Sequence, residues 1–253
     1  MGLNKHPVFL LVMIKCIAQW HYIMNHPVNE PILGYSLGSQ ERIDIQIELD
    51  RQMSQIMEIP CIVNGKKIFT GKTTTQVIPH NHGHVIAKVH LAGKDEMVAA
   101  CKAAVDAQKS WIDIGLEERC AIFERCADLL AGDWRMKVNA STMLNQSKTV
   151  FQAEIDAACE LIDFWRFNCH YARGFHDDLQ PLVSPPGVLN TTEIRPLEGF
   201  ILSITPFNFT SIAANLPSAP AIVGCTSIWK PSRNSYYSNY ILMQLMMEAG
   251  LPD

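Results

Sequence analysis

The apolar run GFILSI at residues 199–204 is followed by a small-residue segment of helical character at 210–223 and by a second apolar run, CTSIW, at 225–229. A further helical segment at 235–249 stops before Gly250, a residue that commonly closes a helix. The order strand, helix, strand, helix predicts an α/β fold in which two units of a doubly wound parallel sheet are present.

The chain before this region is predicted to begin with small antiparallel strands. Residues 61–69 contain two short β-favouring runs joined by Asn64-Gly65, a pair that tolerates the positive φ angles of a hairpin turn. A second turn is predicted at residues 81–84, followed by a strand at 85–89.

Four amphipathic helices are predicted next, and we expect them to form a covering layer. Apolar side chains recur at helical spacing in residues 95–110 and 116–130. A third helix is predicted at 134–146, and a long fourth helix at 152–173 is expected to end at Gly174.

The connection to the sheet region is rich in proline. Residues 180–187 should therefore be extended, and 191–195 favour a strand. We divide the chain into an ill-defined leader at 1–35, a helical and hairpin part at 36–198, and the first half of a dinucleotide-binding fold at 199–253.

Composition excludes several classes of protein. The 253 residues are 48% apolar, enough for a substantial core, and the net charge of −4 comes from interspersed charges that leave no nucleic-acid footprint. The eight cysteines show no zinc-type spacing and indicate free thiols in a reducing compartment. The apolar run at 8–14 is far shorter than the roughly 20 residues of a membrane span. It is a poor signal peptide, and it lacks the Arg- and Ser-rich character of a mitochondrial presequence.

The stretch ITPFNFT at residues 204–210 stands where the first parallel strand leaves the sheet. Ligands bind at the carboxyl ends of strands in open α/β sheets, and the amide of Asn208 can donate a hydrogen bond to a bound carbonyl. On residue type alone, an ordinary strand-to-helix turn capped by an asparagine is the simpler interpretation.

A second turn, IWKPS at residues 228–232, ends the next strand. Together the two turns resemble those that end the first two cofactor-domain strands in the aldehyde dehydrogenase superfamily. The segments EIDAACELIDF at 154–164, PLEGF at 196–200 and NHGH at 81–84 are similar to its pyrroline-5-carboxylate dehydrogenase branch. The resemblance extends from about residue 29 to residue 253, and it implies an aldehyde dehydrogenase-like fold of which the second half of the cofactor domain is missing.

The resemblance implies an activity: the NAD(P)-dependent oxidation of glutamate γ-semialdehyde to glutamate in proline breakdown, by a homo-oligomer of the mitochondrial matrix. Because no clear presequence is present, the cytoplasm is the alternative location. Asn208 would be the oxyanion donor. Phe209 would line the substrate channel, and Glu160 would lie near the active-site cysteine and the substrate. The alternative for Glu160 is a solvated charge on a helix face.

The resemblance also assigns a cofactor site. Lys230 would hydrogen-bond the adenosine ribose, Thr205 would lie beside the phosphate and ribose region, and Ser232 would be a further cofactor-binding residue. Arg233 occupies a position that is usually acidic in the family, so a cation here would favour the 2′-phosphate of NADP over the free hydroxyl of NAD.

In the family, the nucleophilic cysteine and the general-base glutamate come later in the chain, and no cysteine here lies in a context like that of the nucleophile. We therefore expect this chain to be inactive alone. Two alternatives remain open: a non-catalytic fragment that acts as a binding or interaction protein, and a truncated product without function.

Two further features carry predictions. The alternating His80, His82 and His84 raise the possibility of a metal site, but no Asp, Glu or Cys lies close in sequence and the family uses this stretch as a turn, so we expect no metal. Pro217 adds a second proline to the helix that contains Pro220, at a cost of about 3 kcal/mol for an interior proline. With an apolar strand edge left uncovered, we expect the chain made alone to aggregate or to need chaperones.

Overall fold

A computed structural model of the chain describes residues 26–178 and 183–252. Most of the predicted leader, residues 1–25, lies outside the described residues, as do residues 179–182 of the proline-rich connection. Across the described ranges no helix combines the length and the hydropathy of a membrane span.

The first strands form two small sheets. Strand β5 (Asn81–His90) pairs parallel with β1 (Met57–Ile59) and antiparallel with β4 (Thr73–Ile78). Strands β2 (Cys61–Val63) and β3 (Lys66–Ile68) make the predicted hairpin, with Asn64 at φ 49° and Gly65 at φ 72°. The Asn-Gly prediction is confirmed.

The second predicted turn is wrong by two residues. The chain turns at residues 79–80, and β5 already begins at Asn81. Two register shifts on β4, around Val77, absorb the extra residues of β5, so that Ile78 pairs with Asn81. A bulged strand accommodates His82 and Gly83, which the sequence alone suggested for a turn.

The helical layer contains the predicted elements and one that was not foreseen. Helices α3 (Lys94–Asp113), α4 (Gly115–Ala131) and α5 (Arg135–Gln146) confirm three of the predicted helices. Helix α2 (Gln40–Met53) packs against α5 and was not predicted.

The fourth predicted helix is divided by a π turn. Helix α6 (Val150–Ala153) passes through the π turn (Glu154–Cys159) into α7 (Glu160–Asp178). The predicted end at Gly174 is wrong, because this glycine does not adopt the left-handed conformation of a capping glycine and the helix continues past it.

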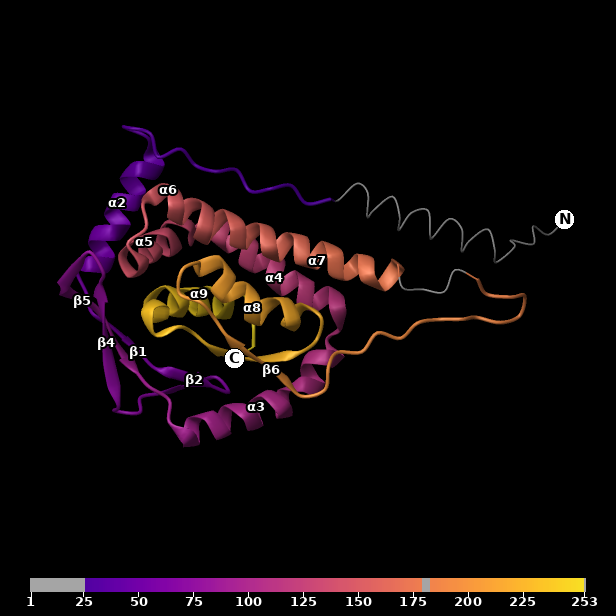
Figure 1. Cartoon of the computed structure of the whole chain (residues 1–253). Coiled ribbons are helices and arrows are strands. Elements are labelled where there is room, and N and C mark those ends of the chain that lie inside the picture. The colour runs from indigo at the N-terminus through magenta and orange to yellow at the C-terminus, as the bar shows by residue number, and fades with distance from the viewer. Residues whose placement is uncertain (1–25, 179–182, 253) are drawn as a thin grey trace.

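The main core lies between α4, α7 and the last helix, α9 (Tyr236–Glu248). Phe123 of α4, Trp165 of α7 and Leu245 of α9 are fully buried. Burying one large apolar side chain is worth about 1.5–3 kcal/mol, so this cluster holds the helical layer to the C-terminal region. Figure 1 shows α4 and α7 running side by side above α8 and α9.

The C-terminal region confirms the predicted α/β units. Strands β6 (Phe200–Ile204) and β7 (Thr226–Lys230) are parallel, with Ile204 opposite Lys230. Helix α8 (Thr210–Ile222) connects them, and it remains helical through Pro217 and Pro220. Figure 1 shows β6 between α8 and α3, and both helices contact the β6–β7 pair.

The approach to this pair differs from the prediction. Residues 191–195 form no strand and pair with no strand of the described chain. In Figure 1 the segment before β6 runs outside the body of the molecule. Leu202 and Ile204 of β6 are 48% and 63% exposed, so this strand is apolar without being fully covered.

Residues 26–35 have no regular secondary structure, but they are anchored to the helical layer. Arg135 lies between Glu30, at 2.6 Å, and Glu154, at 2.5 Å. The hydroxyl of Tyr35 donates to Glu154 (2.7 Å), and the side-chain amide of Asn139 donates to the same carboxylate (2.7 Å). We call Glu30, Tyr35, Arg135, Asn139 and Glu154 the Glu154 cluster.

Candidate functional site

The two parallel strands end side by side, and a direct contact holds their ends together. The backbone N–H of Thr205, just after β6, donates to the carbonyl of Lys230, the last residue of β7 (3.2 Å). The indole N–H of Trp229 donates to the buried hydroxyl of Thr205 (3.1 Å). The turns that follow both strands therefore begin at one edge of the sheet, where open α/β folds bind ligands.

The turn that carries Asn208 is fixed from α5. The side-chain amide of Gln146 is oriented so that its nitrogen and its oxygen are both hydrogen-bonded. The nitrogen donates to the carbonyls of Phe207 and Asn208 (3.3 Å each), and the oxygen accepts from the hydroxyl of Thr210 (2.7 Å). The hydroxyl of Thr210 also contacts that of Thr142 (2.8 Å). The side chain of Asn208 is exposed and makes no hydrogen bond to another described residue, so its amide is available to a ligand.

Glu160 lies against the helix that this turn begins. It is the first residue of α7, directly after the π turn, and its carboxylate accepts a hydrogen bond of 2.5 Å from the hydroxyl of Ser211. Ser211 follows Asn208 by three residues. The structure therefore brings Glu160 to the Asn208 turn and away from the solvated helix face of the alternative interpretation.

Phe209 packs under a cation that the sequence did not single out. The ammonium of Lys148 lies 4.2 Å from the centre of the Phe209 ring and 2.6 Å from Asp156 in the π turn. A cation over an aromatic face is attracted by the ring quadrupole. Lys148 therefore links the Asn208 turn to the π turn that precedes Glu160.

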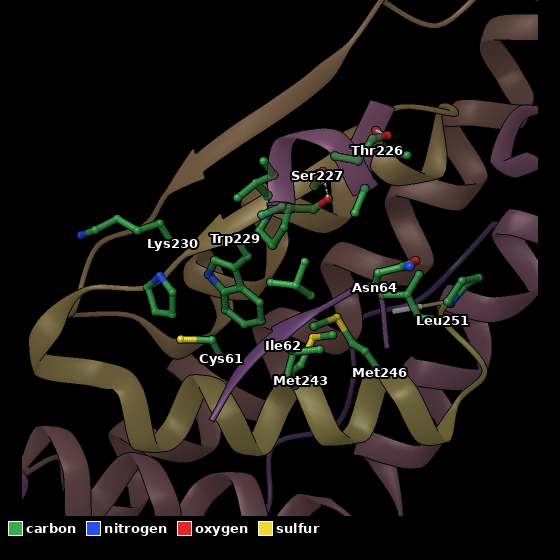
Figure 2. A pocket seen from close by; sticks show the side chains of 18 of the residues that line it. Cys61, Ile62, Asn64, Thr226, Ser227, Trp229, Lys230, Met243, Met246 and Leu251 are labelled. Carbon is green, nitrogen blue, oxygen red and sulfur yellow. Dashed lines mark hydrogen bonds between the residues drawn. The ribbon is translucent and has the colours of Figure 1, made fainter. Parts of the chain in front are cut away.

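The remaining candidate residues follow β7. Lys230 is exposed, and Figure 2 shows its side chain pointing away from Trp229. The hydroxyl of Ser232 accepts from the backbone N–H of Asn234 (3.3 Å) and so caps the short 3₁₀ turn (Arg233–Ser235). Arg233 is exposed, and its carbonyl accepts from Gln76 of β4 (2.9 Å).

Comparison with known proteins agrees with this geometry. Residues 69–253 match the model of the aldehyde dehydrogenase family. The chain belongs to that family. It is 43% identical over 225 residues to the Delta-1-pyrroline-5-carboxylate dehydrogenase of Agaricus bisporus, covering 88% of this chain and 41% of that protein. It is 44% identical over 224 residues to the mitochondrial enzyme of that name from Homo sapiens, covering 88% and 39%.

A solved structure shows the same fold. The Delta-pyrroline-5-carboxylate dehydrogenase from Mycobacterium tuberculosis, solved bound with NAD, superposes with a TM-score of 0.87 at 46% identity, covering 90% of this chain and 42% of that one. The α/β aldehyde dehydrogenase fold is therefore confirmed. The chain spans about two fifths of the length of these relatives.

Two of the three alternating histidines, His80 and His84, have structural partners. The ring of His80 contacts the Ser147 hydroxyl (2.7 Å), and that of His84 contacts the Met53 carbonyl (3.0 Å). Within residues 26–178 and 183–252, no group of three or more histidine, cysteine or acidic side chains is arranged to hold a metal ion.

The cysteines that the structure describes are free thiols, and five of the seven are buried. Burial raises the pKa of Cys126 to about 12, and burial together with the negative charge of Glu154 raises that of Cys159 to about 12. A thiol with such a pKa is almost entirely protonated at neutral pH, and the thiolate is the form that attacks a carbonyl.

Sequence reasoning found Asn208, Phe209 and Glu160 but not the side chains that hold them. Gln146 is the last residue of α5, Lys148 lies between α5 and α6, and Ser211 is the second residue of α8, and no sequence spacing marks any of them. The sequence shows polar residues near the ends of all the predicted helices. That pattern is too general to select these three residues.

Proposed function

We propose that this chain forms part of an NAD(P)-dependent aldehyde dehydrogenase that oxidises glutamate γ-semialdehyde to glutamate. The observation that carries the proposal is the Asn208 turn: it is fixed by Gln146, it leaves the Asn208 amide exposed, and it lies beside the carboxylate of Glu160. Two relatives at 43% and 44% identity are named Delta-1-pyrroline-5-carboxylate dehydrogenase, which supports the choice of substrate.

Asn208 is assigned the oxyanion role. When a thiolate attacks the aldehyde carbon, a carbon–sulfur bond forms and the carbonyl oxygen takes the electron pair and becomes negative. The side-chain N–H of Asn208 donates to that oxygen, and because Gln146 fixes the turn, little reorganisation is needed at the moment of reaction.

Glu160 and Phe209 are assigned to the substrate. The semialdehyde carries an ammonium group and a carboxylate, so it needs polar partners at one end and an apolar lining for its methylene groups. Glu160 provides a carboxylate that is oriented by Ser211, and the Phe209 ring provides the apolar lining while Lys148 covers one of its faces.

The end of β7 fits a dinucleotide. The amine of Lys230 and the guanidinium of Arg233 are exposed, and neither forms an ion pair among the described residues, so both can meet ribose hydroxyls or phosphate. Lys230 and Ser232 would hold the adenosine ribose, with Thr205 at the neighbouring strand end. The bound dinucleotide supplies the hydride acceptor. The relative from Mycobacterium tuberculosis was solved with NAD, and Arg233 favours the phosphorylated form in this chain.

The attacking thiolate and the general base are assigned to residues outside this set. No cysteine of the chain lies in a sequence context like that of the family's nucleophile, and burial raises the pKa of Cys61, Cys126 and Cys159. The described chain therefore supplies positioning and charge stabilisation, and we propose that alone it produces no reduced cofactor from the semialdehyde. We extend the proposal to the mitochondrial matrix, because several relatives are named mitochondrial, and to a homo-oligomer, as the family resemblance implies.

A chimera tests the proposal. The region of the Agaricus bisporus relative that aligns with this chain is replaced by the corresponding residues of this chain, and reduced cofactor is followed with glutamate semialdehyde. We expect a folded, active chimera in which Asn208→Ala lowers kcat by about 10²–10³-fold, the usual effect of losing one oxyanion donor. The matched control is Asn190→Ala, an exposed asparagine in the segment before β6. An Asn208→Ala chimera with unchanged kcat would overturn the assignment, as would a folded chimera with no activity.

A further inference from the structure

Two cysteines face each other across the contact between α4 and α7. Cys120 of α4 and Cys169 of α7 are both fully buried. The thiol of Cys169 points at the backbone carbonyl of Cys120, with 3.6 Å between sulfur and oxygen, and the thiol of Cys120 points at the carbonyl of Cys169 at 4.0 Å. Because each sulfur lies against the backbone of the other residue, both sulfurs occupy the gap between the same two helix turns.

Contacts outside the two sulfurs hold this arrangement in place. Glu117, Cys120 and Glu124 lie on one face of α4, at positions i, i+3 and i+7. Cys169 and Arg173 lie on one face of α7, at positions i and i+4. The guanidinium of Arg173 bonds Glu117 (2.9 Å) and Glu124 (2.5 Å), so it bridges the α4 turns on both sides of Cys120. The two helices run side by side in Figure 1.

The two thiols differ in acidity. A hydrogen bond from the Cys169 thiol lowers the pKa of Cys120 against the effect of burial, and the positive charge of Arg173 acts in the same direction, while the carboxylates paired with Arg173 oppose it. The same hydrogen bond, together with burial, raises the pKa of Cys169. The shared proton therefore stays on Cys169, and Cys120 is the sulfur that can carry a negative charge. The thiolate is the nucleophilic form of a cysteine.

Burial limits which oxidant can reach the pair. The side chains of Arg173, Glu117 and Glu124 are partly exposed, and ion pairs of this kind are weak. The end of α7 can therefore separate from α4 in a local opening, without unfolding of the whole chain. Hydrogen peroxide is uncharged and close to water in size, so a small opening admits it, whereas a bulky thiol reagent needs a wider one.

We propose that Cys120 and Cys169 form a redox modification site, at which a peroxide converts the two thiols into a disulfide that links α4 to α7. The Cys120 thiolate attacks one oxygen of hydrogen peroxide, the O–O bond breaks, and the departing hydroxide takes a proton to give water while Cys120 becomes a sulfenic acid. The Cys169 sulfur then attacks the Cys120 sulfur, the S–O bond breaks, and the thiol proton leaves with the hydroxide as a second water. Two thiols and one peroxide give one disulfide and two waters.

The disulfide should stabilise the helical layer. It joins residues that are 49 positions apart, so it closes a long loop and lowers the conformational entropy of the unfolded chain. A dithiol reductant returns both thiols by exchange, which makes the modification reversible. The inference rests on the cysteine pair alone and stands or falls separately from the proposed aldehyde dehydrogenase activity.

Peptide mapping of the full chain tests the proposal. The reduced, folded chain is treated with hydrogen peroxide, the peroxide is destroyed with catalase, and the chain is unfolded in N-ethylmaleimide and digested without reductant. We expect peptides joined through Cys120 and Cys169, lighter by about 2 Da than the two thiol peptides together because two hydrogens are lost, and separated by dithiothreitol. The midpoint of thermal unfolding should rise by about 5–15 °C. Both cysteines recovered with maleimide, or a link that forms only in urea, would overturn the proposal.

Variants separate the two steps. In Cys169→Ala we expect no link, and a sulfenic acid on Cys120 that dimedone traps. The matched control is Cys126→Ala, which removes a cysteine that is equally buried on the same helix, and in which the link should form as in the wild type. A link that persists in Cys169→Ala through another cysteine, or that is lost in Cys126→Ala, would contradict the assignment. If circular dichroism shows that Cys169→Ala is unfolded, the peptide map of the wild type decides alone.

Discussion

The Glu154 cluster and the strand-end site are built from the same kinds of side chain and use them in opposite ways. In the cluster, the Arg135 and Glu154 side chains are 5% and 0% exposed and are paired with each other and with their neighbours. At the strand ends, Lys230 and Asn208 are exposed and have no partner among the described residues. Charge that is buried and paired defines a position, and charge that is exposed and unpaired is available for a ligand.

The two regions are connected through the π turn. Glu154 is its first residue, and Glu160, which we propose to face the substrate, follows its last residue. Asp156 inside the turn holds Lys148 over Phe209. The Glu154 cluster therefore orients the start of α7, and the first residue of α7, Glu160, faces the Asn208 turn. Four predictions test whether the Glu154 cluster stabilises the fold while the strand-end site binds ligands. They are given from the largest to the smallest expected effect on the unfolding free energy.

The largest effect should come from Arg135→Met. The substitution leaves the carboxylate of Glu154 buried without its cation, whereas Glu30 keeps Arg166 at 2.7 Å, and breaking a buried pair in this way typically costs about 3–5 kcal/mol of unfolding free energy. Urea denaturation followed by tryptophan fluorescence measures it. The control is Lys102→Met, whose ion pair with Asp106 is exposed and worth about 0–1 kcal/mol. Similar losses in the two variants would mean that the Glu154 cluster contributes no more than a surface ion pair.

The second prediction is a pH dependence of the same cluster. Burial acts to raise the pKa of Glu154, but hydrogen bonds from Arg135, the Leu33 N–H and Tyr35 outweigh it and hold the pKa below the usual 4.5. A carboxylate with a lowered folded pKa contributes stability above its unfolded pKa and loses it as the pH falls through the folded value. The stability advantage of the wild type over Glu154→Gln should therefore be full near neutral pH and shrink below about pH 4.5. Thermal unfolding from pH 3 to pH 7 measures both proteins, and an advantage that grows toward low pH would contradict the assignment.

A smaller loss of unfolding free energy is expected at Gln146, where α5 contacts the Asn208 turn. Gln146→Leu removes the amide that holds the Phe207 and Asn208 carbonyls and Thr210, at a cost of about 1–3 kcal/mol for the groups left unpaired. The control Gln46→Leu removes an exposed amide that bonds only to Asp50 on the same helix. In the chimera, Gln146→Leu should lower kcat more than it raises KM, because a loose turn misplaces the oxyanion donor. If KM changed alone, Gln146 would have no role in positioning Asn208.

The smallest effect on stability belongs to Arg233→Glu, an exposed site where we expect a change within about 0.5 kcal/mol. The effect on ligands should be larger: the preference for NADP over NAD should reverse, by about three- to tenfold, as expected of one exposed charge contact. Calorimetry measures both affinities, which we expect on the order of millimolar for a site with few contacts. Lys109→Glu, an exposed charge on α3, is the control. Micromolar NAD binding, or a preference that Arg233→Glu leaves unchanged, would contradict this prediction.

The sequence was sufficient where a local pattern had one physical solution. The apolar runs of β6 and β7 with a helical segment between them have few alternatives to a parallel unit, and Asn64-Gly65 has the left-handed φ angles that a tight hairpin requires. Gly250, at φ 95°, ends α9 as predicted. These features depend on residues that are adjacent in the chain.

Helix α2 shows where a local pattern misleads. Ile43, Ile45, Ile47 and Leu49 alternate with polar residues, a spacing typical of a strand, yet the segment is helical. Ile45 is buried, with Glu48 and Gln52 on the same side, while Ile43 and Ile47 are 47% and 61% exposed. Packing against α5 and the bond from Gln52 to the Lys137 carbonyl (2.9 Å) select the helix, and neither is visible in the segment itself.

The candidate site divides in the same way. The resemblance of the motifs at 154–164, 204–210 and 228–232 to the aldehyde dehydrogenase family gave the candidates, which are Asn208, Phe209, Glu160, Thr205, Lys230, Ser232 and Arg233. Only the tertiary structure brought Glu160 to Ser211, Lys148 to Phe209 and Gln146 to the Asn208 turn, across separations of 51 residues or more. The physical reason is that a turn is set by the φ and ψ angles of neighbouring residues, whereas a contact between distant segments is set by how the helical layer packs on the β6–β7 pair.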